Sequence, residues 1–138
     1  MIREAVAEDI PEIVEMLARL AEASGALGKF SKKAAKVAVI RQIEEQGRVL
    51  FRSEKGLIAG FIVIPWDSPD WLMAFEMWWW AEDGKWMPLL RKLERWARQQ
   101  GAGEVRIFTK IGPQSKRINA VFRRSGYGPR EICYRKEL

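Results

Sequence analysis

The chain has 138 residues, of which 48% are apolar and 30% charged, a composition typical of one globular domain with a net charge of +6. Its one cysteine, Cys133, and its lack of histidine exclude an internal disulfide framework and argue against a zinc site or a Cys–His nucleophile. Residues 1–84 hold 10 basic and 14 acidic residues whereas residues 85–138 hold 14 and 4, so the C-terminal part either meets an anion or presents a solvated basic surface.

The first third of the chain predicts a short strand and two helices. Residues 2–6 read as the strand. Asp9 stands where a helix N-cap is expected, and Glu12 follows at the capping-box spacing, before apolar residues that recur at helical intervals. Ser31 is expected to cap a second helix that runs to about Gln46.

The middle of the chain predicts three strands and a helix. Residues 48–53 and 56–66 flank the hairpin signal "SEKG", and the second run is nearly continuous in apolar residues, as in a strand buried on both faces. A polar loop with two prolines separates them from a further strand at 72–80. Residues 86–100 carry an apolar stripe at helical spacing and end before Gly101.

The last third predicts strand, helix and strand. Residues 104–110 read as a strand, Ser115 can cap a helix that ends at Gly126, and residues 130–138 alternate as a final strand. The order β-α-α-β-β-β-α-β-α-β combines a hairpin with strands joined through single helices. We therefore predict an α/β fold with a mixed, mainly antiparallel central sheet and helices on both faces, in a single domain spanning 1–138.

Four stretches in this order resemble the GNAT superfamily of N-acetyltransferases. They are "IREAVAEDIPEIVEML", "GLIAGFIVI", "LLRKLERWARQQGAGEVRIF" and "INAVFRRSGYGPREICYRKEL", and together they span nearly the whole chain. The "WWW" before the loop "AEDGKW" is similar to GNAT-like proteins encoded by bacteriophages. The resemblance implies an acyl-CoA acyltransferase fold and transfer of an acetyl group from acetyl-CoA to an amine.

The resemblance also implies where acetyl-CoA binds. In the family, the pantetheine arm enters a slot between the fourth and fifth strands, and a loop of the form [RQ]-x-x-G-x-[GA] holds the pyrophosphate at a helix N-terminus. In "AEDGKW", Gly84 matches the first glycine, and Ser115 stands where many members have asparagine. The implied cofactor-binding residues are Trp79, Trp80, Ala81, Gly84, Lys85, Trp86 and Ser115.

The loop departs from the family pattern in composition and length. Ala81 replaces the arginine or glutamine, Trp86 replaces the second glycine, and the turn is about four residues short of the usual one. Glu82 and Asp83 place negative charge where a pyrophosphate would lie, and basic residues beside them could offset it. Asp83 could alternatively cap the following helix.

Glu76 is the candidate general base, since the family often uses a glutamate on the fourth strand. A strict strand period puts Glu76 on one face with Trp78 and Trp80, where aromatic surroundings could raise its pKa; the alternative is that Glu76 pairs with a basic side chain. The tyrosine that serves the family as general acid is replaced by Phe122. Tyr127 is a candidate substitute, as is Tyr134, although the alternative is that Tyr127 packs as the aromatic residue that the family has after Gly126.

Two functions remain open on the sequence. The first is an N-acetyltransferase whose amine acceptor is unidentified, a small molecule or a protein lysine. The second is a catalytically degenerate binding module that meets nucleic acid without sequence preference, or a host protein, through basic residues such as Arg91, Arg95 and Arg98. No metal site is expected. Neither a membrane span nor a signal core is visible, so we expect no membrane partner and a cytoplasmic location. Exposed tryptophans such as Trp66 and Trp71 would form a binding patch and favour a homodimer, whereas tryptophan in a core is the ordinary expectation.

Overall fold

The structure is a computed structural model of the chain that describes residues 1–25, 28–109, 112–113 and 115–138. Its contacts divide the chain into two compact units, residues 1–107 and 108–138, and each unit is described by itself. The single domain over residues 1–138 stays a prediction.

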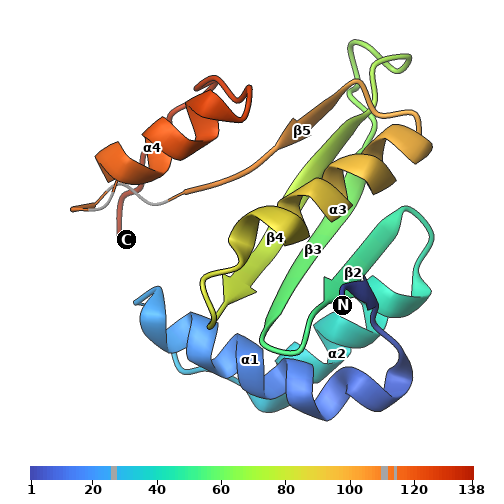
Figure 1. Cartoon of the computed structure of the whole chain (residues 1–138), viewed down its shortest axis with the longest axis vertical. Coiled ribbons are helices and arrows are strands. Elements are labelled where there is room, and N and C mark those ends of the chain that lie inside the picture. Colours follow the sequence, from blue (N-terminus) through green and yellow to red (C-terminus); the bar gives the residue numbers. More distant parts are fainter. Residues whose placement is uncertain (26–27, 110–111, 114) are drawn as a thin grey trace. The chain divides into compact units, whose positions relative to one another are not determined.

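The first unit is built on a five-stranded sheet in the order β1-β2-β3-β4-β5 (Figure 1). The strands are β1 Arg3–Glu4, β2 Arg48–Arg52, β3 Gly56–Val63, β4 Met73–Ala81 and β5 Glu104–Arg106. The first three pairs of neighbours are antiparallel, and β4 pairs with β5 in parallel. The predicted mixed, mainly antiparallel sheet is confirmed, with a shorter first and fifth strand than the sequence suggested.

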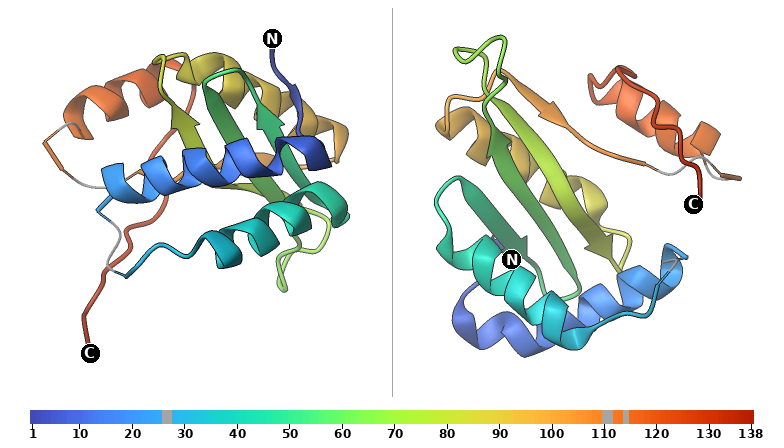
Figure 2. Two further views of the ribbon diagram at one scale, coloured as in Figure 1. Left: turned by 90° about the horizontal axis from the view of Figure 1, so that it is seen from below. Right: turned by 180° about the vertical axis from the view of Figure 1, so that it is seen from behind.

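Helices cover both faces of this sheet, as Figure 2 shows. The helices α1 Ile10–Ala23 and α2 Lys32–Glu44 pack on one face, where a core cluster joins them to β2 and β3. Members of this cluster include Ile13, Leu17, Val39, Leu57 and Ala59. The helix α3 Trp86–Gln99 lies on the opposite face and buries Leu89, Leu90 and Leu93. We call the two sides the α1–α2 face and the α3 face.

Gly60 on β3 lets α3 approach the sheet closely. A Cβ built at this position would lie 2.6 Å from Leu93 Cδ1 and 3.2 Å from the carbonyl oxygen of Phe75. Any side chain there would push α3 away from the sheet or shift β4. The glycine thus fixes the distance between α3 and the centre of the sheet.

Asp9 is the N-cap residue of α1, as predicted, but its side chain makes no capping hydrogen bond to this helix. Its carboxylate accepts a hydrogen bond from the backbone N–H of Val6 (2.9 Å) and binds both terminal nitrogens of Arg3 at 2.7 and 2.8 Å. Arg52 adds a contact of 3.0 Å to Asp9 and one of 2.5 Å to Glu12. The Asp9 side chain does not bond a helix N–H because two guanidinium groups offer its carboxylate stronger partners. We call Arg3, Asp9, Glu12 and Arg52 the N-terminal charge cluster.

The pairing changes the proton affinity of these groups. The two-point contact with Arg3 holds the pKa of Asp9 far below its usual range, and the Arg52 guanidinium lowers the pKa of Glu12. Both carboxylates therefore remain charged at neutral pH.

The predicted cap of α2 is confirmed, because Ser31 Oγ accepts from the N–H of Ala34 at 3.1 Å.

The described residues of the second unit contain one helix, α4 Ser115–Arg124. Ser115 is its first residue, and the Ser115 hydroxyl accepts from the N–H of Gly112 at 2.6 Å. The predicted last strand is wrong: residues 127–138, all of which are described, form neither strand nor helix. Alternation in sequence cannot make a strand without a neighbouring strand to pair with. Cys133 is exposed.

Candidate functional site

The strand β4 has two halves with different surroundings. Along its whole length it pairs with β3, but its parallel pairing with β5 covers only Met73–Phe75. From Glu76 onward, no strand of the described chain pairs with the other edge of β4. Backbone N–H and C=O groups on this edge can hydrogen-bond an extended ligand in the way a neighbouring strand would. We call residues 76–81 the open half of β4.

A β-bulge marks the point where the open half begins. Trp78 lies opposite Ala59 and Glu76 lies opposite Gly60, so Met77 is an extra residue on β4 with no partner on β3. A bulge of this kind interrupts the alternation of side chains along the strand. The prediction that Glu76 shares a face with Trp78 and Trp80 is therefore wrong.

Glu76 instead lies on the α3 face, together with its partner Gly60. Its side chain is buried, with an exposure of 8%. It is the first residue of β4 beyond the pairing with β5, which places a buried carboxylate at the fork between the two strands. A carboxylate at this fork can accept a proton from an amine that approaches the open half of β4. The alternative pairing of Glu76 with a basic side chain stays a prediction.

The three consecutive tryptophans divide between the two faces. Trp78 and Trp80 pack against the core cluster under α1 and α2. Trp79 points to the α3 face, where its ring meets that of Trp86 edge-on with centroids 5.9 Å apart. Trp86 remains 45% exposed, so it covers the start of α3 and is only partly core. This aromatic pair fixes the entry of α3 against the open half of β4.

The loop between β4 and α3 satisfies much of its own backbone. The N–H of Glu82 donates to the carbonyl of Lys55 (2.9 Å), and the N–H of Gly84 donates to Ala81 (3.3 Å). The N–H of Lys85 donates to the Asp83 carboxylate at 3.1 Å. Asp83 therefore bonds the N–H of Lys85, the residue just before α3. The alternative that Asp83 caps α3 itself is wrong. Its carboxylate takes an N–H that a phosphate oxygen could otherwise use.

Glu82, the other acidic residue of the loop, has its partner on α1. Its carboxylate forms an ion pair with Arg19, and this contact lowers the pKa of Glu82 below its usual value. The pair neutralises one of the two acidic charges that the sequence placed beside a pyrophosphate. Nothing in the sequence signals it, because Arg19 and Glu82 are 63 positions apart.

Gly84 leaves the loop sterically accessible. It adopts a φ of +70°, a left-handed conformation that favours glycine. A Cβ built here would meet nothing within 4 Å, so the space above this backbone is open. Lys85 is exposed at the start of α3 and Ala81 ends β4 opposite Gly56. An anionic group can approach the first turn of α3 from this side, where the helix leaves N–H groups without intrahelical partners.

The remaining predicted site residues belong to the second unit. The N–H of Tyr127 donates to the carbonyl of Phe122 (3.0 Å), and their rings lie 6.0 Å apart. This packing matches the alternative reading of Tyr127. The catalytic role of Tyr127 and the cofactor contact of Ser115 stay predictions.

Two loop tryptophans lie outside any core. Trp66 is 94% exposed and Trp71 is 51% exposed, both between β3 and β4. The Trp71 indole N–H donates to Glu104 at 2.8 Å. Core packing is thus wrong for these two residues, while a homodimer through them stays a prediction.

In the described part of the chain, no three potential metal ligands cluster, and no helix is long and apolar enough to cross a membrane.

No protein-family model matches the sequence, and no curated protein matches it either. Solved structures do match in shape over nearly the full chain. A predicted acetyltransferase from Clostridium acetobutylicum, crystallised with acetyl-CoA, gives a TM-score of 0.77 at 12% identity over 99% of this chain and 95% of that one.

Two further matches agree with this one. An acetyltransferase from Trypanosoma brucei gives a TM-score of 0.73 at 17% identity over 100% of this chain and 99% of that one. The enzyme AAC(6')-Iy, in complex with a bisubstrate analogue of CoA and acetylneamine, gives 0.74 at 16% identity over 100% and 98%. The chain therefore has the GNAT fold. The resemblance to bacteriophage proteins finds no support in these structures.

Proposed function

We propose that this chain is a GNAT-type N-acetyltransferase that moves the acetyl group of acetyl-CoA to an amine. The observation that carries the proposal is the open half of β4, which begins at a bulge beside a buried glutamate and leads directly into the N-terminus of α3. Two of the similar structures carry acetyl-CoA or a CoA-derived analogue, which supports the same donor here.

The donor fits the residues present with one exception. The open half of β4 offers strand backbone to an extended amide-bearing arm. Gly84 offers space and Lys85 offers positive charge beside the first turn of α3. The exception is Asp83, whose carboxylate competes for the N–H of Lys85. Acetyl-CoA would supply an activated acetyl thioester to this site.

Glu76 would receive the proton that the reaction releases. A C–N bond forms between the amine and the acetyl carbon, the C–S bond breaks, and the sulfur leaves with the bonding electrons. The amine proton passes to the Glu76 carboxylate, directly or through one water. A thiol with a pKa of about 8.5 leaves readily as the thiolate. The reaction therefore does not require the tyrosine that Phe122 replaces.

The acceptor can be sought among amines that the similar proteins suggest. Aminoglycosides belong in the panel because AAC(6')-Iy was solved with an acetylneamine analogue. Polyamines and lysine peptides complete it, because acidic residues outnumber basic ones in the N-terminal part. The test is mass spectrometry of each amine after incubation with acetyl-CoA and either the wild type or Glu76→Gln. Acetylated product made by the wild type and lost in the variant is expected; product formed equally by both would remove Glu76 from the mechanism.

The binding module is the second candidate, because the loop already occupies its own N–H donors at Glu82, Gly84 and Lys85. Under that reading, the wild type does not bind acetyl-CoA and charge reversal at Arg91 and Arg95 weakens binding of a partner. Under the enzyme reading, the same reversal leaves acetyl transfer to the best acceptor within a few-fold of normal.

A further inference from the structure

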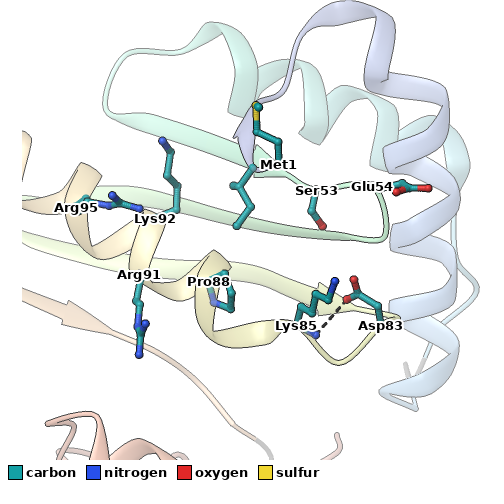
Figure 3. Close-up of a pocket in the computed structure, with 10 residues that line it drawn as sticks. Met1, Ser53, Glu54, Asp83, Lys85, Pro88, Arg91, Lys92 and Arg95 are labelled. Atoms are coloured by element: carbon teal, nitrogen blue, oxygen red, sulfur yellow. Dashed lines mark hydrogen bonds between the residues drawn. The ribbon is translucent and has the colours of Figure 1, made fainter.

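A pocket lies along one flank of α3. It has a volume of about 590 Å³ and is bounded by α3, the β4–α3 loop and the turn between β2 and β3 (Figure 3). Four of its lining residues are basic: Lys85, Arg91, Lys92 and Arg95. We call it the basic pocket.

The basic pocket lies away from the open half of β4. Its lining includes Ser53 and Glu54 from the β2–β3 turn, and no lining residue comes from β5. The Lys92 ammonium lies 5.6 Å from the ring centroid of Phe51, which places this part of α3 over β2. The sheet order puts β2 two strands from β4, whereas the open edge of β4 faces the other way. The β4–α3 loop and α3 border both regions.

The basic residues of this pocket lack acidic partners in the described part of the chain. None of the four takes part in an ion pair there, whereas Arg3, Arg19, Arg48 and Arg52 all do. The lining contains two acids, Glu54 and Asp83, so the pocket keeps a net charge of +2. Like charges held close together repel each other, and an incoming anion relieves that repulsion.

The side chains are suited to phosphate oxygens. Figure 3 shows Lys92 and Arg95 on the same side of α3, while Arg91 extends away from them. A guanidinium donates two parallel hydrogen bonds to a phosphate, and an ammonium adds a compact charge. No aromatic side chain lines the pocket, so nothing is provided to stack a base. The volume falls within the range of small-molecule sites and does not describe an extended groove.

We propose that the basic pocket binds the polyphosphate group of a small molecule, at a site distinct from the one where acetyl-CoA would bind. Lys92 and Arg95 make the phosphate contacts. This site does not depend on acetyl transfer, and its test uses the full chain with inorganic pyrophosphate as the probe.

The experiment is a calorimetric titration of pyrophosphate into the wild type, Arg95→Gln and Lys92→Met. One site with a Kd below about 1 mM is expected for the wild type, and about tenfold weaker binding for each variant. Arg98→Gln is the matched control, because Arg98 lies on the same helix, is exposed and does not line the pocket. It should change the affinity by less than about twofold, and circular dichroism checks that each variant is folded.

Several results would overturn the proposal. They are an absence of pyrophosphate binding by the wild type, an equal loss in Arg98→Gln, and tighter binding of an oligonucleotide that depends equally on all three residues. A second titration in saturating acetyl-CoA separates the two phosphate sources. Retained pyrophosphate affinity supports a distinct site, and full competition assigns the pocket to the phosphates of acetyl-CoA and refutes the proposal. If acetyl-CoA does not bind at all, the proposed function fails while the pyrophosphate result still decides this inference.

Discussion

The N-terminal charge cluster pairs each of its acidic side chains with a guanidinium group. The basic pocket differs, because Lys92 and Arg95 of α3 line it and form no ion pair in the described chain. The first arrangement fixes the N-terminal strand against β2, and each charge in it is satisfied. The second leaves charge available to a ligand. In the β4–α3 region, Glu76 is buried and Asp83 occupies a backbone donor. This contrast teaches that substitutions in the N-terminal charge cluster should change stability, and substitutions in the β4–α3 region should change binding or turnover.

The largest effect is expected from Glu76→Gln, which tests the functional side of the contrast. Removing a general base costs typically about 10²- to 10⁴-fold in rate, so kcat should fall by at least about 10²-fold with little change in donor affinity. Steady-state kinetics with the best acceptor measure it. Glu44→Gln, at the exposed end of α2, is the control and should be neutral. A normal kcat in Glu76→Gln would break the contrast at its functional end.

Asp9→Asn tests the structural side. It removes the carboxylate from two guanidinium groups and leaves Arg52 partly buried, which should cost about 3 kcal/mol of the free energy of unfolding. Urea denaturation measures this cost, with the neighbouring exposed Glu8→Gln as control. Donor affinity of the folded variant should stay normal, and a selective loss of donor binding with unchanged stability would contradict this role.

The same cluster predicts a pH dependence of stability. The folded pKa of Asp9 is depressed, so its contribution is fully present above the unfolded pKa of about 3.9 and is lost as the pH falls below that value. The wild type should therefore lose more stability between pH 5 and pH 3 than Asp9→Asn does. Parallel urea titrations at both pH values test this, and equal losses in the two proteins would refute it.

Asp83→Asn should strengthen acetyl-CoA binding. It removes a negative charge beside the first turn of α3, while the asparagine amide oxygen can still accept from the N–H of Lys85, so the affinity should rise by about three- to tenfold. Calorimetry measures the change, and Asp67→Asn in the exposed β3–β4 loop controls for net charge. Unchanged or weaker binding in Asp83→Asn would contradict the view that the Asp83 charge opposes the donor.

The smallest effect is expected from Gly84→Ala. The site has open space, so the cost is confined to the left-handed backbone and should be about 1 kcal/mol of the free energy of unfolding. Gly28→Ala is the matched control, since it is equally open but has no positive φ. Thermal unfolding compares Gly84→Ala with Gly28→Ala. An equal, negligible loss of stability in both variants would contradict the claim that a side chain at residue 84 strains the backbone.

The sequence predicted the elements of the sheet and its helices because apolar periodicity and turn residues act locally. The hairpin at "SEKG", the cap at Ser31 and the parallel pairing of β4 with β5 all followed from such patterns. The last strand did not, since residues 130–138 alternate in sequence but have no strand beside them in the described structure.

The position of the cofactor site stays a prediction, and one of its structural details was wrong. Its location between β4 and α3 came from family resemblance, and Gly84 has the backbone freedom expected of a loop glycine. The face on which Glu76 lies was wrong because a bulge at Met77 depends on pairing with β3, which no local pattern reveals. The ion pair of Arg19 with Glu82 and the partners of Asp9 are long-range contacts of the same kind.

The most direct measurement is a calorimetric titration of the purified, folded chain with acetyl-CoA and, separately, with CoA. The account predicts one site with micromolar affinity, about −8 kcal/mol, with both ligands bound through the open half of β4 and the start of α3. The absence of binding at millimolar ligand, in protein shown to be folded, would contradict the acetyltransferase assignment and leave the GNAT fold as a binding module.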